Sequence, residues 1–228
     1  PLHPYFVFFR TTLNYVIMRL IKLKMRDWMK TYRIAGIELN IRHQSNSFLI
    51  NNIEHYEIPF VQHVKHTLEV DYVHHIDHPI GHSKSTKNPY TIYLDEKRII
   101  FIKNKEGKIK TLIEHDVLYQ HVSILINPNL LDNVQEMEYT WLGLIFMEIA
   151  LLHGFLPIHG AAINDHGQAI IISAPSQTGK STHAALWKEM DSSIEILNDD
   201  KPLIGLLNDH LMVYSSPFSG KKIGRAHV

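Results

Sequence analysis

A glycine, a lysine and two hydroxyl residues follow one another where an apolar segment gives way to a helix-forming one. Residues 169–173 read Ala-Ile-Ile-Ile-Ser, and Gly179-Lys180-Ser181-Thr182 comes after a short polar loop. In a strand–loop–helix unit of this kind, backbone N–H groups and the helix N-terminus face a polyphosphate. The lysine adds a point charge, and the serine hydroxyl can ligate Mg²⁺. We therefore predict a phosphate-binding loop.

The predicted loop departs from the pattern G-x-x-x-x-G-K-[ST] at its first position, where alanine stands in place of glycine. Alanine tolerates a positive φ poorly, so we expect the chain to turn differently at that point. The alternative interpretation is an ordinary strand-to-helix turn. The residues predicted to contact phosphate are Ala174, Pro175, Ser176, Gln177, Thr178, Gly179, Lys180, Ser181 and Thr182.

Two adjacent acids end the next apolar segment, at Asp199 and Asp200. A carboxylate at a strand end near a phosphate loop can hold Mg²⁺ or accept the proton of an attacking hydroxyl. Successive strand residues point in opposite directions, so the two acids could divide these roles. The alternative is a polar turn before Lys201 and Pro202.

The strand that leads into the loop is predicted to be half of a β-hairpin. Residues 157–163 form a first strand, Asn164-Asp165-His166-Gly167 has turn chemistry, and residues 168–173 form the second strand. In ordinary P-loop NTPases this strand lies in a parallel sheet that is reached by helical crossovers. The hairpin therefore indicates a different architecture.

Upstream, residues 31–127 have a strand-like pattern. We expect an antiparallel, strand-rich region with apolar strands near 34–41, 48–53, 90–94, 98–102, 109–113 and 119–126. From Leu130 to about His153, apolar residues recur every three or four positions, which predicts one long, buried helix. The predicted fold class is α/β, or α+β when the whole chain is considered.

Composition narrows the functional classes. The 228 residues carry no net charge with histidine neutral, so no broad basic field attracts nucleic acid or an anionic membrane. The absence of cysteine excludes disulfides and thiolate metal sites, which fits a cytoplasmic protein. The 17 histidines are interpreted as surface residues rather than a metal site.

The ordered set of motifs resembles the catalytic domain of the HPr kinase/phosphorylase family, whose nucleotide-binding core is shared with phosphoenolpyruvate carboxykinases. The matching features are His159-Gly160, the turn at 164–167, Gly179-Lys180-Ser181, the following helix and Asp199-Asp200. The resemblance implies a bent mixed sheet and ATP with Mg²⁺, with phosphoryl transfer to a serine of a protein or peptide.

On this resemblance, His159 and Lys180 lie near the phosphates, Ser181 and Asp200 are linked to the metal, and one acid of the pair is the base. Ala174 and Gln177 replace glycines usual in true HPr kinases, and the later family signature is not found, so the chain is more similar to divergent HPr-kinase-related proteins. The carrier HPr is therefore not assumed to be the acceptor, and a homo-oligomer is left open.

The expected division is a doubtful extension at 1–30, a strand-rich domain at 31–128, a C-terminally truncated P-loop domain at 129–222 and a translated artefact at 223–228. Residues 1–24 resemble neither a signal peptide nor a membrane span. Two other functions stay open: a nucleotide-binding accessory protein or pseudokinase, and a carboxykinase-like enzyme. The latter needs a cluster of arginines, which we cannot place near the loop.

Overall fold

The computed structural model describes residues 29–44, 47–81, 84 and 87–218. Within them the protein is mixed α/β, with a large eight-stranded mixed sheet, two three-stranded sheets and three α-helices. This confirms an α+β class with a strand-rich N-terminal region. The predictions about residues 1–28 and 223–228 lie outside the described residues, although Met29 and Lys30 belong to the first strand.

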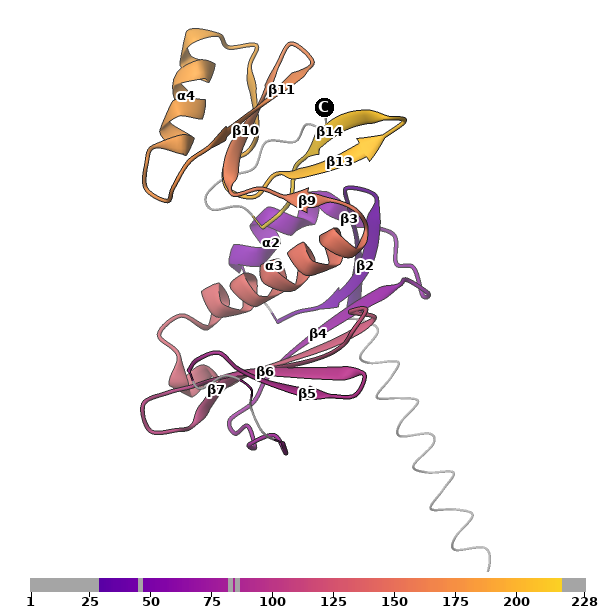
Figure 1. Cartoon of the computed structure of the whole chain (residues 1–228), viewed down its shortest axis with the longest axis vertical. Helices are drawn as coiled ribbons and strands as arrows, with labels where there is room; N and C mark the ends of the chain where they lie inside the picture. The colour runs from indigo at the N-terminus through magenta and orange to yellow at the C-terminus, as the bar shows by residue number, and fades with distance from the viewer. Residues whose placement is uncertain (1–28, 45–46, 82–83, 85–86, 219–228) are drawn as a thin grey trace, which may run out of the picture.

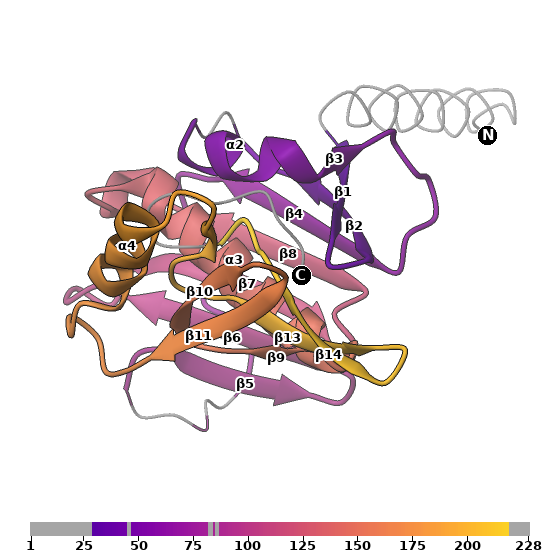
Figure 2. The same ribbon diagram turned by 90° about the horizontal axis from the view of Figure 1, so that it is seen from above.

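The large sheet has the strand order β3-β1-β2-β4-β8-β7-β6-β5. Figure 1 shows it as the magenta and violet part of the molecule, and Figure 2 shows the same strands from above. Its strands are β1 (Met29–Ile34), β2 (Ile37–Arg42), β3 (Glu57–Ile58), β4 (His66–Tyr72), β5 (Tyr90–Leu94), β6 (Lys97–Lys103), β7 (Ile109–Asp116) and β8 (His121–Ile126).

The expectation of a purely antiparallel region is wrong, because β4 pairs in parallel with both β2 and β8. Hairpins follow the turn signals of the sequence: β1 pairs with β2, β5 with β6, and β6 with β7. Parallel neighbours need longer connections. Here a helix, a 3₁₀ turn and β3 separate β2 from β4, and three strands separate β4 from β8.

The apolar run predicted as a strand at 48–53 is instead a helix, α2 (Ser47–Ile53), followed by the 3₁₀ turn η1 (Glu54–Tyr56). Leu49 and Ile53, four residues apart, are buried, whereas Ile50 between them is exposed. A spacing of four places two side chains on one face of a helix. The short run lacked enough residues for its period to be read with certainty.

Helix α3 (Val134–Leu152) lies across one face of the large sheet (Figure 1). Its N-cap is Asn133, whose Oδ1 accepts a hydrogen bond from Glu136 N at 3.0 Å. The helix begins four residues later than predicted because η2 (Pro128–Leu130) precedes it. The core beneath it contains Leu203 and Phe218 as well as strand residues. Residues on both sides of the expected domain boundary at 128/129 thus contribute to one hydrophobic core. The division into two domains stays a prediction.

The remaining strands form two small sheets. One has the order β11-β10-β12, from β10 (Gly160–Asp165), β11 (Gln168–Ser173) and β12 (Glu195–Asn198); the other has the order β14-β13-β9, from β9 (Leu156–Pro157), β13 (Leu203–Leu207) and β14 (His210–Tyr214). Helix α4 (Lys180–Met190) packs on the first sheet through Ala184 and Trp187, against Ala161, Ile163 and Ile194. The predicted hairpin is confirmed as β10–β11.

A buried carboxylate joins α3 to the ends of two strands. Glu138 is fully buried; its Oε1 accepts from the backbone N–H of Gln44 at 3.1 Å, and its Oε2 accepts from the Tyr72 hydroxyl at 2.6 Å. Burial, and then the Glu138 carboxylate, raise the pKa of the Tyr72 phenol. Removing this carboxylate would leave two donors in an apolar interior.

We expect Glu138→Ala to lower the free energy of unfolding by about 3 kcal/mol, because it leaves a cavity and two orphaned donors. Urea denaturation measures the change. Glu148→Ala, at an exposed position of the same helix, is the matched control and should stay within about 0.5 kcal/mol of the wild type. Equal losses in both variants would contradict the role given to Glu138.

A second, partly buried polar contact joins β4 to the residue that follows α3. His66 is fully buried, with Nδ1 2.8 Å from the Tyr119 carbonyl oxygen and Nε2 2.9 Å from Nε2 of His153, just after α3. The carbonyl can only accept, so Nδ1 of His66 carries the proton and His153 donates to Nε2. Burial lowers the pKa of both imidazoles, and in His153 the neighbouring His66 lowers it further.

Because both pKa values are lowered in the folded protein, the unfolded chain binds more protons below about pH 6.5. The free energy of unfolding should therefore fall as the pH drops from about 6.5, and this contribution should be absent above it. Urea denaturation from pH 8 to 5 measures the slope. His153→Asn should reduce the slope, whereas His121→Asn, at an exposed position, should leave it unchanged; an unchanged slope in both would refute the assignment.

Candidate functional site

The predicted functional groups come to one edge of the small sheet β11-β10-β12. Strand β10 pairs antiparallel with β11 on one side and with β12 on the other, so β11 and β12 run in the same direction. Gly160, at the start of β10, faces Ser173 at the end of β11, and Ala162 faces Asn198 at the end of β12. The loop after β11, the acids after β12 and His159 before β10 therefore share this edge.

The loop from 174 to 179 folds around the side chain of Lys180. This lysine is only 8% exposed, and its Nζ donates to the carbonyl oxygens of Ala174 at 3.0 Å and Pro175 at 3.1 Å. The hydroxyl of Thr178 also donates to the Pro175 carbonyl, at 2.7 Å. The ammonium is thus held within the loop, where a phosphate-binding lysine is needed.

Helix α4 begins immediately at Lys180, with Gly179 as its N-cap at φ +89°. Ser181 and Thr182 are exposed in its first turn. The first backbone N–H groups of a helix have no acceptor within the helix. Here they lie beside the loop, which favours binding of an anion. The strand–loop–helix order predicted from the sequence is confirmed, while phosphate binding itself stays a prediction.

The backbone of the loop turns at Gln177 and not at Ala174. Gln177 has φ +65°, in the left-handed region, whereas Ala174 is not among the residues with positive φ. Alanine therefore causes no strain at the first loop position. Glycine adopts this conformation without steric cost, whereas the side chain of glutamine makes it less favourable.

Asp200 is flanked by two nitrogen groups. Its Oδ1 lies 3.5 Å from Nε2 of His159, and its Oδ2 lies 3.2 Å from Nζ of Lys201. The side chain is 28% exposed, so it can be reached from solvent. The Ser173 hydroxyl donates to the His159 carbonyl at 3.1 Å, which ties this histidine to the end of β11.

The neighbouring Asp199 is half-buried, and its Oδ1 is a buried atom. Burial raises the pKa of Tyr139 on α3, and the charges of Asp200 and Asp199 raise it further. The acid pair thus lies close enough to α3 for its charge to act on this phenol. Tyr139 itself donates to the Pro217 carbonyl at 2.8 Å.

Asn198 positions the acids, although no motif of the sequence predicts a role for it. It is fully buried, and its Oδ1 accepts from the backbone N–H of Asp200 at 2.9 Å and of Lys201 at 2.8 Å. Its Nδ2 donates to the Ser216 carbonyl at 3.1 Å. An asparagine just before a polar turn is the local signal that could have revealed it.

The residues fit a magnesium ion held jointly with phosphate. Among the residues that the structure describes, no group of three or more histidine, cysteine, aspartate or glutamate side chains is arranged to hold a metal. Mg²⁺ does not need such a group, because it usually keeps several waters and binds one or two carboxylates and substrate phosphates. Asp200 and the hydroxyl of Ser181 supply the ligand types required.

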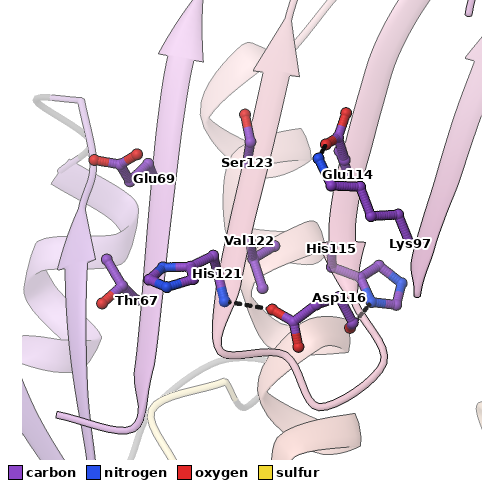
Figure 3. Close-up of a pocket in the computed structure, with 9 residues that line it drawn as sticks. All are labelled: Thr67, Glu69, Lys97, Glu114, His115, Asp116, His121, Val122 and Ser123. Carbon is purple, nitrogen blue, oxygen red and sulfur yellow. Dashed lines mark hydrogen bonds and ion pairs between the residues drawn. The ribbon is translucent and has the colours of Figure 1, made fainter.

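A separate concave surface lies on the large sheet, with a volume of about 280 Å³ (Figure 3). Side chains of β4, β7 and β8 line it, including Glu69, Glu114 and Ser123. Glu114 pairs with Lys97, and Glu69 lies 3.4 Å from Arg42 Nε. Arg42 bonds Asp71 more closely, at 2.6 and 2.8 Å, so its single positive charge is shared between Asp71 and Glu69.

After β14 the structure describes the chain as far as Phe218. Ser216 in this segment is buried, and its hydroxyl donates to the Lys201 carbonyl at 3.0 Å. In the described part of the chain, no helix is long and apolar enough to cross a membrane.

We expect Asn198→Ala to destabilise the protein by about 2–3 kcal/mol, because three hydrogen bonds of a buried side chain are lost. Asn164→Ala is the matched control: its side chain also bonds a turn N–H, of Gly167 at 2.8 Å, but at an exposed site. That variant should lose about 1 kcal/mol or less. Thermal and urea denaturation of the two variants measure the difference, and equal losses would contradict it.

No protein-family model matches the chain, and no curated protein shows a significant match.

Proposed function

We propose that the protein binds ATP with Mg²⁺ at residues 174–182 and transfers the γ-phosphoryl group to a serine hydroxyl of a protein or peptide, in the manner of HPr-kinase-like enzymes. The proposal includes the finer fold assignment, a P-loop domain of the phosphoenolpyruvate carboxykinase type. The observation that carries it is the common edge of β11-β10-β12, where the loop, His159 and the acid pair meet.

The loop N–H groups and Lys180 bind the β- and γ-phosphates, and the ammonium exchanges its two carbonyl partners for phosphate oxygens. Ser181 and Asp200 would hold Mg²⁺, which when bound neutralises charge on the phosphates. The acceptor oxygen bonds to the γ-phosphorus while the bond to the ADP oxygen breaks. A carboxylate of the Asp199–Asp200 pair takes the hydroxyl proton, and His159 supports Asp200 from 3.5 Å.

Most of the acceleration in such a site comes from positioning and from fixed charge rather than from covalent chemistry. The structure supports this on two counts. Asp200 is anchored through both its backbone N–H and its carbonyl, and the Lys180 side chain is enclosed by its own loop. Groups that are already in place need little reorganisation when charge develops.

A nucleotide-binding accessory protein without transfer is the second candidate. Gln177 favours it, because a side chain replaces a hydrogen atom at a left-handed position of the loop. The carboxykinase-like alternative needs arginines to bind substrate carboxylates. Arg33, Arg42 and Arg98, the arginines of the described chain, all lie in strands of the large sheet.

Calorimetry with MgATP tests the proposal. The wild type should bind one MgATP, and Lys180→Ala should weaken binding at least about tenfold, because a charge-assisted contact to phosphate is lost. Lys188→Ala, at the exposed end of α4, is the matched control and should leave the affinity unchanged. Since Lys180 is buried, the exposed Ser181→Ala variant is measured as well; it should weaken MgATP binding more than binding of metal-free ATP.

Absence of MgATP binding by the wild type would overturn the proposal. Binding with no ADP formation in the presence of hydroxyl acceptors would favour the accessory protein. If the wild type forms ADP, Asp200→Asn should slow it by about 10²-fold or more, the usual contribution of a base in proton transfer.

A further inference from the structure

The ion pair between Lys201 and Asp200 lies within the proposed nucleotide site. Lys201 Nζ is 3.2 Å from Asp200 Oδ2, and the two side chains are 40% and 28% exposed. From the sequence, Lys201 is predicted only as part of a turn. Its contact places a second cation, in addition to Lys180, at the edge where the phosphates are proposed to bind.

Asp200 cannot easily move away from this lysine. Its backbone N–H donates to Asn198 Oδ1 at 2.9 Å, and its carbonyl accepts from Gly160 N–H at 2.9 Å. Its other carboxylate oxygen faces His159. A magnesium ion that binds this carboxylate must therefore compete with a nitrogen group on either oxygen.

Lys201 is also fixed at its backbone but not at its tip. Its N–H donates to Asn198 Oδ1 at 2.8 Å, and its carbonyl accepts from the Ser216 hydroxyl at 3.0 Å. The ammonium is carried by a flexible four-carbon stem with three donors that can turn to a new partner. Of the two partners in this ion pair, the lysine is the one able to move.

Magnesium and the ammonium cannot share Oδ2 without cost. Mg²⁺ binds a carboxylate oxygen at about 2.0–2.1 Å in an octahedral shell, so a lysine that stayed beside the same oxygen would face a divalent cation at close range. Phosphate oxygens arriving with the metal offer the displaced ammonium a new anionic partner.

We propose that Lys201 is an exchange lysine: its ammonium neutralises Asp200 until Mg²⁺ takes the carboxylate, and then turns to the phosphate oxygens of the nucleotide. The proposal rests on the proposed function and adds the regulation of that site. Metal and nucleotide binding are coupled through a single ion pair. The lysine keeps its proton throughout, and no covalent bond changes.

The test compares ATP affinity in MgCl₂ with ATP affinity in EDTA, and takes the ratio of the two as the metal coupling. Lys201→Met removes the ammonium and keeps an unbranched stem. Metal-free ATP should then bind more weakly, because the Asp200 carboxylate is no longer neutralised and repels the phosphates. MgATP binding should be weakened less, because Mg²⁺ takes the place of the ammonium on Asp200 and the lost phosphate contact is offset by the ion pair that no longer has to break. The coupling ratio should therefore rise at least about fivefold.

Two controls separate the exchange from a general charge effect. Lys188→Met removes a lysine from the far end of α4 and should leave both affinities unchanged. In an Asp200→Asn background, Lys201→Met should no longer raise the ratio, since the two residues would act through one contact.

An unchanged ratio in Lys201→Met would overturn the exchange. Equal weakening of both affinities would also overturn it, because Lys201 would then only attract phosphate. If the wild type binds no MgATP, the proposed function and the exchange fall together. If it binds MgATP and the ratio does not respond, only the exchange is overturned.

Discussion

The double pairing of β10 is the constraint on which the site depends. Because β10 pairs antiparallel with both of its neighbours, β11 and β12 run parallel to each other, and a helix connects them along the chain. Backbone pairing alone therefore brings the ends of β11 and β12 to the same edge, whichever side chains they carry. The loop after β11 and the acids after β12 are brought together by backbone geometry, and only the details of charge are left to individual residues.

Buried polar groups determine how the small sheet sits against the rest of the molecule. Asn198 connects the turn after β12 to the chain near Ser216, and Tyr139 on α3 bonds the Pro217 carbonyl. Helix α3 is in turn packed on the large sheet and bonded to it through Glu138. The proposed site is thus supported by a continuous series of contacts that reaches β4.

The sequence predicted those parts of the fold that local signals determine. The hairpin at 164–167, the loop before Gly179 and helix α4 follow from turn residues, strand patterns and a helix start that lie within a few positions of one another. The place of His159 and Asp200 at one edge was expected from a resemblance, and the pairing of β10 supplies its physical reason.

The errors and omissions concern non-local choices. Nothing in residues 66–72 reveals that β4 will pair in parallel on both sides, because the strand pattern is the same for either direction. Residues 48–53 are too few to separate a helical from an extended period. The bonds from Asn198 to the backbone N–H groups of Asp200 and Lys201 follow from its place before a turn, whereas its bond to Ser216 spans 18 residues and could not be read from neighbouring residues.

Strand β10 is enclosed on four sides, and this limits how its sequence can change. Both edges are paired, Ala161 and Ile163 face α4, and Ala162 faces Leu197 and Val213 on the opposite side. At Gly160, a methyl group would come within 3.0 Å of the Ile172 carbonyl oxygen. This strand therefore acts as a fixed reference for the loop after β11 and the acids after β12, and we expect sequence changes to be tolerated mainly in the turns that leave it.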